Sequence, residues 1–197
     1  GLNDLATAYA ALGVYLQSKG NAQAKQTFES SLMYAGRAMD LDAKYLTPIQ
    51  NSLFLWARLI STANSESDLT QMIARADDLY SRCMKINDKY QMCNDNYLLV
   101  YARAAQRMME GGLDPQVQLA RAFEMQAQIA KLGGAFLDAE QHSALAHYVD
   151  ASEKLKKRQS PGDALTEVEG ALKRCFAQAD KDAMCRTIAA QTEWIKS

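Results

Sequence analysis

The chain has 197 residues, with 22 Lys and Arg against 23 Asp and Glu, a formal net charge of −1 and 48% hydrophobic residues. This balance argues against a nucleic acid or an anionic membrane as a partner held by bulk charge, and no apolar run approaches the roughly 18 residues that insert across a membrane. Only 3 Pro and 10 Gly occur, helix-forming residues abound and no alternating strand pattern is visible, so we expect an all-α protein.

In chain order, four segments each read as two helices with a break between them, and one shorter segment follows: residues 2–41, 47–86, 91–132, 136–179 and 183–195. The breaks contain Gly, Pro, Ser or Asn, which end helices or begin them, at 20–21, 64–68, 111–115 and 160–163. The last helix carries Ile188 and Trp194, which we expect to cover the apolar face of the fourth pair. The pattern predicts a single domain, 1–197, of four helical hairpins with a C-terminal capping helix.

A repeat of 45 to 47 residues connects the hairpins. Large aromatic residues recur at the same place in the odd-numbered helices, at Tyr9, Trp56, Tyr101 and Tyr148. The stretch 82–93 returns 92 residues later, or two periods, as 174–185, with Arg-Cys, Asp-Lys and Met-Cys at identical offsets. Hairpins that bury their apolar faces on the next hairpin build an α-solenoid, which we expect to be right-handed.

The first hairpin resembles a tetratricopeptide repeat. Tyr9, the pair Leu12-Gly13, Leu16 and Gly20 are similar to the first helix of that motif. The run Met39-Asp40-Leu41-Asp42 resembles the end of its second helix, with Ala43 where the family prefers Pro. The family period is about 34 residues, so the helices of this chain are longer.

The longer period, with Gly112-x-Asp114-Pro115, resembles the repeat array that follows the kinase domain in many bacterial serine/threonine kinases of the eukaryotic type. The kinase motifs themselves do not occur in this chain. Because the chain starts at Gly1 rather than Met, we read it as a fragment of a longer protein. The resemblance implies a non-catalytic protein- or ligand-binding module, the sensor or docking region of a larger bacterial signalling protein such as a membrane serine/threonine kinase. An extracytoplasmic scaffold of an envelope assembly or secretion system is the alternative.

The four cysteines allow three interpretations, namely disulfides, buried thiols or a metal site. One zinc site would need all four sulfurs within a few ångströms, whereas two repeats separate the pairs by roughly 20 Å at ordinary helix packing distances. Within a pair, one Cys ends a helix and the other begins the next helix, which suits a disulfide. We therefore favour the pairs Cys83–Cys93 and Cys175–Cys185, without metal or cofactor, and an oxidising, extracytoplasmic (periplasmic) compartment.

Catalytic residues are not evident. His142 and His147 are five residues apart and do not share a helical face as a ligand pair would, so we interpret them as structural. We find no combination of a nucleophile and a base and expect no enzyme activity, although an all-α enzyme with a pocket remains a third possibility.

A partner is expected on the concave face, which the odd-numbered helices line in arrays of this type. The positions five and eight residues after each aromatic are Val14, Gln17, Ser61, Asn64, Gln106, Met109, Glu153 and Lys156. They are mostly polar and uncharged, which suits hydrogen bonds to an extended protein or peptide partner or to a small polar ligand. They are equally compatible with ordinary solvated positions.

Overall fold

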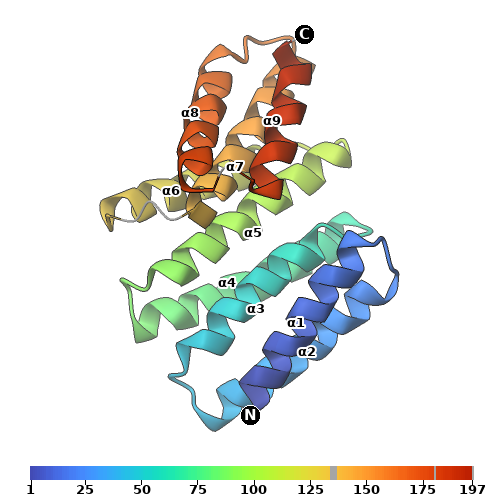
Figure 1. Ribbon diagram of the computed structural model, residues 1–197, viewed down its shortest axis with the longest axis vertical. Helices are drawn as coiled ribbons and strands as arrows, with labels where there is room; N and C mark the ends of the chain where they lie inside the picture. Colours follow the sequence, from blue (N-terminus) through green and yellow to red (C-terminus); the bar gives the residue numbers. More distant parts are fainter. Residues whose placement is uncertain (134–136, 180, 197) are drawn as a thin grey trace. The chain divides into compact units, whose positions relative to one another are not determined.

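The computed structural model describes residues 1–133, 137–179 and 181–196. These residues form nine α-helices and no strand, which confirms the all-α prediction (Figure 1). The helices are α1 (Leu2–Ser18), α2 (Gln23–Leu41), α3 (Leu46–Ile60), α4 (Glu66–Ile86), α5 (Gln91–Glu110), α6 (Gln116–Lys131), α7 (Leu137–Lys156), α8 (Gly162–Gln178) and α9 (Ala183–Lys196). The predicted hairpin limits lie within one residue of these helix ends. The predicted start of the fourth hairpin, residue 136, is outside the described residues.

Local residues explain where the helices break. Gly20 follows α1 with φ 65°, and Gly112 follows α5 with φ 74°. Glycine adopts this left-handed backbone without a steric penalty and so ends a helix. Ser65 begins α4, because its hydroxyl accepts a hydrogen bond from the backbone N–H of Asp68 at 3.1 Å and satisfies one of the first free donors of the helix.

The chain divides into two compact units, Gly1–Val100 (unit 1) and Tyr101–Ser197 (unit 2). The boundary falls within α5. The single domain expected from the sequence stays a prediction.

In unit 1, α1 packs along α2, α3 packs against both of them, and α4 packs on α3 (Figure 1). Phe28 of α2 is fully buried in this core. It lies so close to Gly13 of α1 that a Cβ atom at residue 13 would be 2.5 Å from the Phe28 ring. Arg82 of α4 donates hydrogen bonds to the carbonyls of Met39 and Ala43, each at 3.2 Å, and so attaches the second hairpin to the end of the first.

In unit 2, α7 is the central helix and packs against α6, α8 and α9. Val149 of α7 and Val168 of α8 are fully buried between these helices. Helix α9 contributes Ile188 and Ile195 to the same core, as we expected of Ile188. Trp194, which we expected on the same covering face, is instead 74% exposed.

The first and last three helices have the same contacts. Helices α1, α2 and α3 all touch one another, and so do α7, α8 and α9. Each set is a hairpin followed by one helix that packs on both of its members, which agrees with an array of stacked hairpins. Helix α9 therefore packs on the hairpin of α7 and α8 in the way that α3 packs on the hairpin of α1 and α2. The right-handed sense of the array and the tetratricopeptide relationship stay predictions.

Among the described residues, the turn that leads out of a hairpin has the same backbone bonds at three places, namely at 42–45, at 87–90 and between Ala179 and Asp182. In each turn the first N–H bonds to the carbonyl four residues earlier, and the last N–H bonds to the carbonyl of the first residue. The first residues, Asp42, Asn87 and Ala179, share an extended backbone with φ between −155° and −141° and ψ between 96° and 101°. The repeat is therefore present in the backbone as well as in the sequence.

None of the helices in residues 1–133, 137–179 and 181–196 combines the length and the hydrophobicity that spanning a lipid bilayer requires.

Candidate functional site

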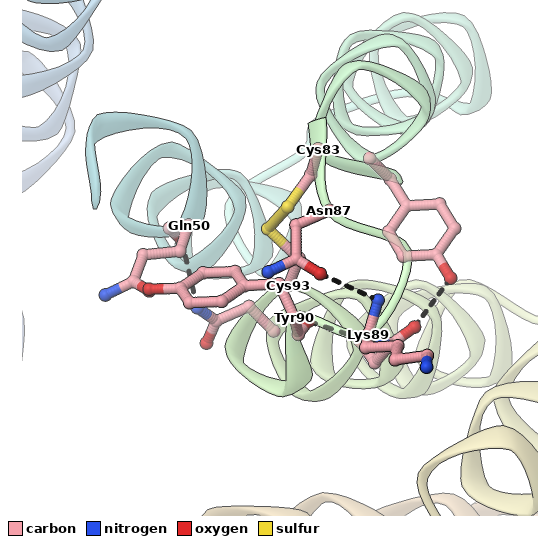
Figure 2. The surroundings of a disulfide bond; sticks show 9 residues. Gln50, Cys83, Asn87, Lys89, Tyr90 and Cys93 are labelled. Atoms are coloured by element: carbon pink, nitrogen blue, oxygen red, sulfur yellow. Dashed lines mark hydrogen bonds between the residues drawn. A yellow bond between two sulfur atoms is a disulfide. The ribbon is translucent and has the colours of Figure 1, made fainter. Parts of the chain in front are cut away.

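Each predicted cysteine pair spans one of the recurring turns. Cys83 at the end of α4 is joined to Cys93 at the start of α5, with their Cα atoms 6.6 Å apart (Figure 2). Cys175 of α8 and Cys185 of α9 are joined in the same way, with a Cα separation of 6.7 Å. All four side chains are buried. Two pairs at disulfide distance fit an oxidising compartment.

Polar contacts fix the turn beside the first disulfide. The backbone N–H of Lys89 donates to Oδ1 of Asn87 at 3.1 Å, and the hydroxyl of Tyr90 donates to Oε1 of Gln50 on α3 (Figure 2). The turn is thus held to α3 as well as to its own helices. These contacts give this region a structural role.

Three groups that could hold a metal ion meet at the second disulfide, within 4.8 Å of one another: Cys175, Asp182 and Cys185. The two sulfurs, however, are bonded to each other. Asp182 accepts from the backbone N–H of Cys185 at 2.8 Å through Oδ1, and from Nε2 of Gln141 at 2.9 Å through Oδ2. Asp182 thus caps the start of α9, so the cluster is explained by structure alone.

Two of the predicted binding residues of unit 1, Gln17 of α1 and Ser61 after α3, contact Arg58. Ser61 and Asn64 are exposed, whereas Gln17 and Val14 are partly buried. Oε1 of Gln17 lies 3.5 Å from Nη1 of Arg58, and the hydroxyl of Ser61 donates to the Arg58 carbonyl at 2.6 Å. Repeat spacing does not predict that Arg58 is a neighbour of both Gln17 and Ser61.

The Arg58 side chain is largely enclosed by its neighbours and makes few hydrogen bonds. Burial lowers the pKa of its guanidinium from the usual value, and the group lies 5.0 Å from the ring centre of Phe54. Its Nε is buried without a hydrogen-bond partner among the described residues. Because that nitrogen is closed off from solvent, it offers a ligand no accessible donor. The predicted contacts of Gln17, Ser61 and Asn64 with a partner stay a prediction.

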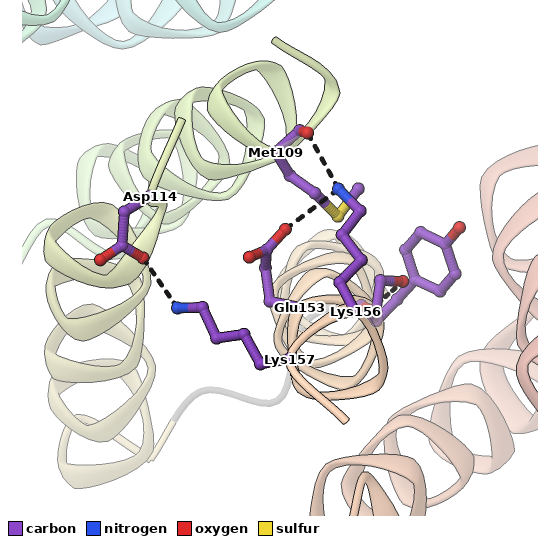
Figure 3. A network of polar contacts seen from close by, with 7 residues as sticks. Met109, Asp114, Glu153, Lys156 and Lys157 are labelled. Carbon is purple, nitrogen blue, oxygen red and sulfur yellow. Dashed lines mark hydrogen bonds and ion pairs between the residues drawn. The ribbon is translucent and has the colours of Figure 1, made fainter. Parts of the chain in front are cut away.

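Three of the four predicted residues of unit 2, namely Met109, Glu153 and Lys156, come together in a structural contact. Nζ of Lys156 donates to the Met109 carbonyl at 3.0 Å and pairs with Oε1 of Glu153 at 3.1 Å (Figure 3). Next to it, Lys157 pairs with Asp114 at 3.2 Å. The Met109 carbonyl lies in the last turn of α5, where it also accepts from the backbone N–H of Gly112 at 3.2 Å, so Lys156 of α7 is its second donor.

This contact decides which of these residues a partner can reach. The side chains of Met109 and Glu153 are buried, which removes them from the surface. Lys156 is exposed, and Gln106 is partly buried with its Oε1 accepting from Nη1 of Arg103 at 2.8 Å. Only the exposed part of the predicted set can touch a ligand directly.

A cavity of about 430 Å³ lies over α7 in unit 2. Its wall is made by α6, Gly133, α7 and α8, and its residues are Gln126, Ile129, Ala130, Gly133, Ala139, Glu140, Ser143 and Arg174. The buried carboxylate of Glu140 accepts from Nε of Arg174 at 2.8 Å, while half of the Arg174 side chain remains exposed. An amide, a hydroxyl and an ion pair thus face an apolar wall, which is typical of a ligand pocket in both size and composition.

His147 supports the side of this cavity. Its Nε2 lies 3.2 Å from Oε1 of Gln126, and its ring stacks on Phe123 with centres 4.7 Å apart. Burial lowers the pKa of His147, although the charges of Glu167 and Asp150 raise it. At neutral pH the ring is therefore uncharged, and the tautomer protonated at Nε2 completes the contact with Gln126.

A smaller cavity of about 200 Å³ has the matching place in unit 1, over α3 and between α2 and α4. Trp56 and Leu59 of α3 and Met72 of α4 form its apolar part. Neither cavity coincides with the groove predicted along the odd-numbered helices, because the even-numbered helices border both of them. The contact of Glu140 with Arg174 joins residues on different helices, so no spacing rule along one helix predicts it.

The chain matches no protein-family model, no curated protein and no solved structure.

Proposed function

We propose that this chain is a non-catalytic binding module whose contact site is the cavity over α7 in unit 2. The observation that carries the proposal is the convergence of three helices on a cavity of about 430 Å³ with polar groups on an apolar wall. Binding sites for small ligands and for single side chains of a partner have this character.

The chemistry of the wall favours a short extended peptide segment. Arg174 uses Nε for Glu140 and is half exposed, so its remaining nitrogens are open to a backbone carbonyl or a carboxylate. Ile129, Ala130 and Ala139 leave space for a small apolar side chain. The net charge of −1 supports a partner recognised by shape and hydrogen bonds rather than by bulk charge.

A binding role is also supported by the surroundings of the histidine. Nε2 of His147 is directed at the Gln126 amide, where it positions a wall residue. Such a contact fixes the shape of the cavity, whereas a general base would be aimed at a hydroxyl or at water.

We place this module in a larger bacterial signalling protein, such as a membrane serine/threonine kinase, with the module on the extracytoplasmic side. The paired cysteines support the compartment, and the resemblance of the repeat supports the parent. Labelling of free thiols in intact and in lysed cells tests the compartment. If the cysteines of these two pairs react with the thiol label without reductant in the full-length protein, the extracytoplasmic location is contradicted.

A peptide library displayed on phage, selected on the oxidised chain, tests the binding site. The variant Ala130→Trp fills the cavity from an exposed position of α6, and Ala127→Trp, one turn earlier and outside the cavity wall, is the matched control. We expect peptides selected on the native chain to lose at least tenfold in affinity for Ala130→Trp and to bind Ala127→Trp unchanged.

The predicted surface on the odd-numbered helices is the competing location. The triple variant Gln17→Ala, Asn64→Ala and Gln106→Ala should leave the selected peptides bound. Loss of binding in this triple variant, with Ala130→Trp unaffected, would move the site to the odd-numbered helices. Failure to select any peptide would overturn the proposal of a peptide-binding module.

A further inference from the structure

The outward face of α1 is apolar from Leu5 to Tyr15. Leu5 is 46% exposed, Leu12 is 48% exposed and Tyr15 is 59% exposed. Ala8 and Ala11 lie between them and are also exposed. We call these five residues the α1 row. They fall on one side of the helix at spacings of three and four residues, so they form one continuous patch rather than scattered exposure.

The matching face of α3 shows what such a row does in this protein. Counting 47 residues from Leu5, Ala8 and Leu12 gives Ser52, Leu55 and Leu59. These three are 1%, 0% and 1% exposed, in a helix that packs against both α1 and α2. The equivalent positions on α3 are therefore packing positions, and the α1 row has the composition of a surface that another helix covers.

The α1 row is complementary to itself when two copies run antiparallel. With the centre between Ala11 and Leu12, Ala8 faces Tyr15 of the second copy and Ala11 faces its Leu12. Leu5 faces Ser18, which lies beyond the row, so each large side chain meets a small one. The same alignment places Asp4 of each copy opposite Lys19 of the other, which gives one such contact at each end of the row. Both lie at the exposed ends of the row, and the Asp4 side chain is 84% exposed even with the terminal ammonium as its partner.

We propose that the α1 row binds the α1 row of a second copy of this chain, antiparallel about a twofold axis between Ala11 and Leu12. A twofold contact uses the same patch on both partners, as self-complementarity requires. The contact comprises one helix from each copy and is small for a protein interface, so we expect a dimer with a dissociation constant of about 1 to 100 µM. This property is additional to the proposed ligand site in unit 2.

Sedimentation velocity of the oxidised chain over a range of concentrations tests the dimer. The decisive variant is Leu12→Glu, which places a carboxylate at the centre of the contact. The matched control is Leu41→Glu, because Leu41 is 81% exposed and lies outside α1. Both positions are exposed, so circular dichroism and the melting temperature should stay as in the native chain. We expect Leu12→Glu to weaken the dimer at least tenfold and Leu41→Glu to leave it unchanged.

Exchange of the terminal charges tests the antiparallel alignment. Asp4→Lys and Lys19→Asp each place like charges opposite one another in their own dimers. An equimolar mixture of the two variants restores opposite charges at both contacts, so it should form dimers more tightly than either variant alone. A native chain that stays monomeric, a dimer that survives Leu12→Glu, or a mixture no tighter than its components would each overturn the proposal.

Discussion

At the scale of single residues, the contact of Gly13 with Phe28 is the most sensitive point of the first hairpin. A Cβ at residue 13 would lie 2.5 Å from two atoms of a ring that is fully buried, so the ring has no space into which it can move. We expect Gly13→Ala to lower the free energy of unfolding by about 1 to 3 kcal/mol, measured by urea denaturation.

Gly36 provides the matched control for this substitution. It also lies within a helix, and a Cβ there would meet nothing within 4 Å. Gly36→Ala should therefore stabilise the chain by about 0.5 to 1 kcal/mol, because alanine loses less backbone entropy in a helix. Equal effects of the two substitutions would show that α1 and α2 do not approach as closely as described.

The pKa of His147 predicts a dependence of stability on pH. Burial lowers this pKa in the folded chain, so the unfolded chain takes up a proton at a higher pH than the folded chain does. The unfolded state then binds more protons in this range, and stability decreases as the pH falls below about 6.5. Urea denaturation from pH 8 to pH 5 should show a smaller decrease for His147→Gln than for the native chain. Identical pH profiles would contradict this assignment.

At the scale of elements, the recurring turn predicts a third disulfide. Ala38 and Pro48 stand 45 residues before Cys83 and Cys93, around a turn with the same two backbone hydrogen bonds. Both are buried, as the natural cysteines are. We expect a chain with Ala38→Cys and Pro48→Cys to form the new bond on oxidation, which mass spectrometry after proteolysis without reductant will detect.

The control for this design moves one cysteine by one residue. Met39→Cys with Pro48→Cys keeps the sequence separation nearly the same but turns the first sulfur to another side of α2. It should leave free thiols. If the designed pair and the control pair form disulfides equally well, then proximity along the chain explains the result and the shared turn geometry does not.

The helices could be predicted from the sequence because their ends depend on local chemistry. Gly20 and Gly112 stop helices through their own backbone, so the breaks next to them were visible in the chain. The cysteine pairs were visible because their spacing repeats after 92 residues. The exposure of Trp194 could not be predicted in this way, because it depends on which side of α9 faces α7 and α8.

The candidate site was harder to predict for the same reason. From the sequence, Glu153 is expected to be a polar surface residue, but it is buried and pairs with Lys156, which reaches the end of α5. Arg82 and Arg174 keep the same register, yet the first binds backbone carbonyls and the second binds Glu140. Repeat spacing fixes position, whereas the partner of a side chain depends on its neighbours in space.

At the scale of the whole molecule, each disulfide belongs to a different unit. Cys83 and Cys93 lie in unit 1, and Cys175 and Cys185 lie in unit 2. Each closes a short loop, so removal of one should cost somewhat under 3 kcal/mol in the unit that contains it. We expect the variant Cys83→Ser with Cys93→Ser to speed hydrogen exchange in α3 and α4 and to leave α7 to α9 as protected as before.

The mirror variant completes this experiment. Cys175→Ser with Cys185→Ser should speed exchange in α8 and α9 and spare α1 to α4. Loss of protection over the entire chain in either variant would show that the two units unfold together as one cooperative body.

The position of the disulfides also has a mechanical consequence. Each bond bridges the end of one helix and the start of the next, so a force pulling on the two ends of the chain passes through sulfur instead of through the turn. The ten residue steps inside each bridge, about 35 Å of extended chain, cannot be drawn out while the bond persists. Reduction of a bond would release about 35 Å of extended chain, less the 6.6 or 6.7 Å that already separates the bridged Cα atoms, so the redox state sets how far the chain can be extended.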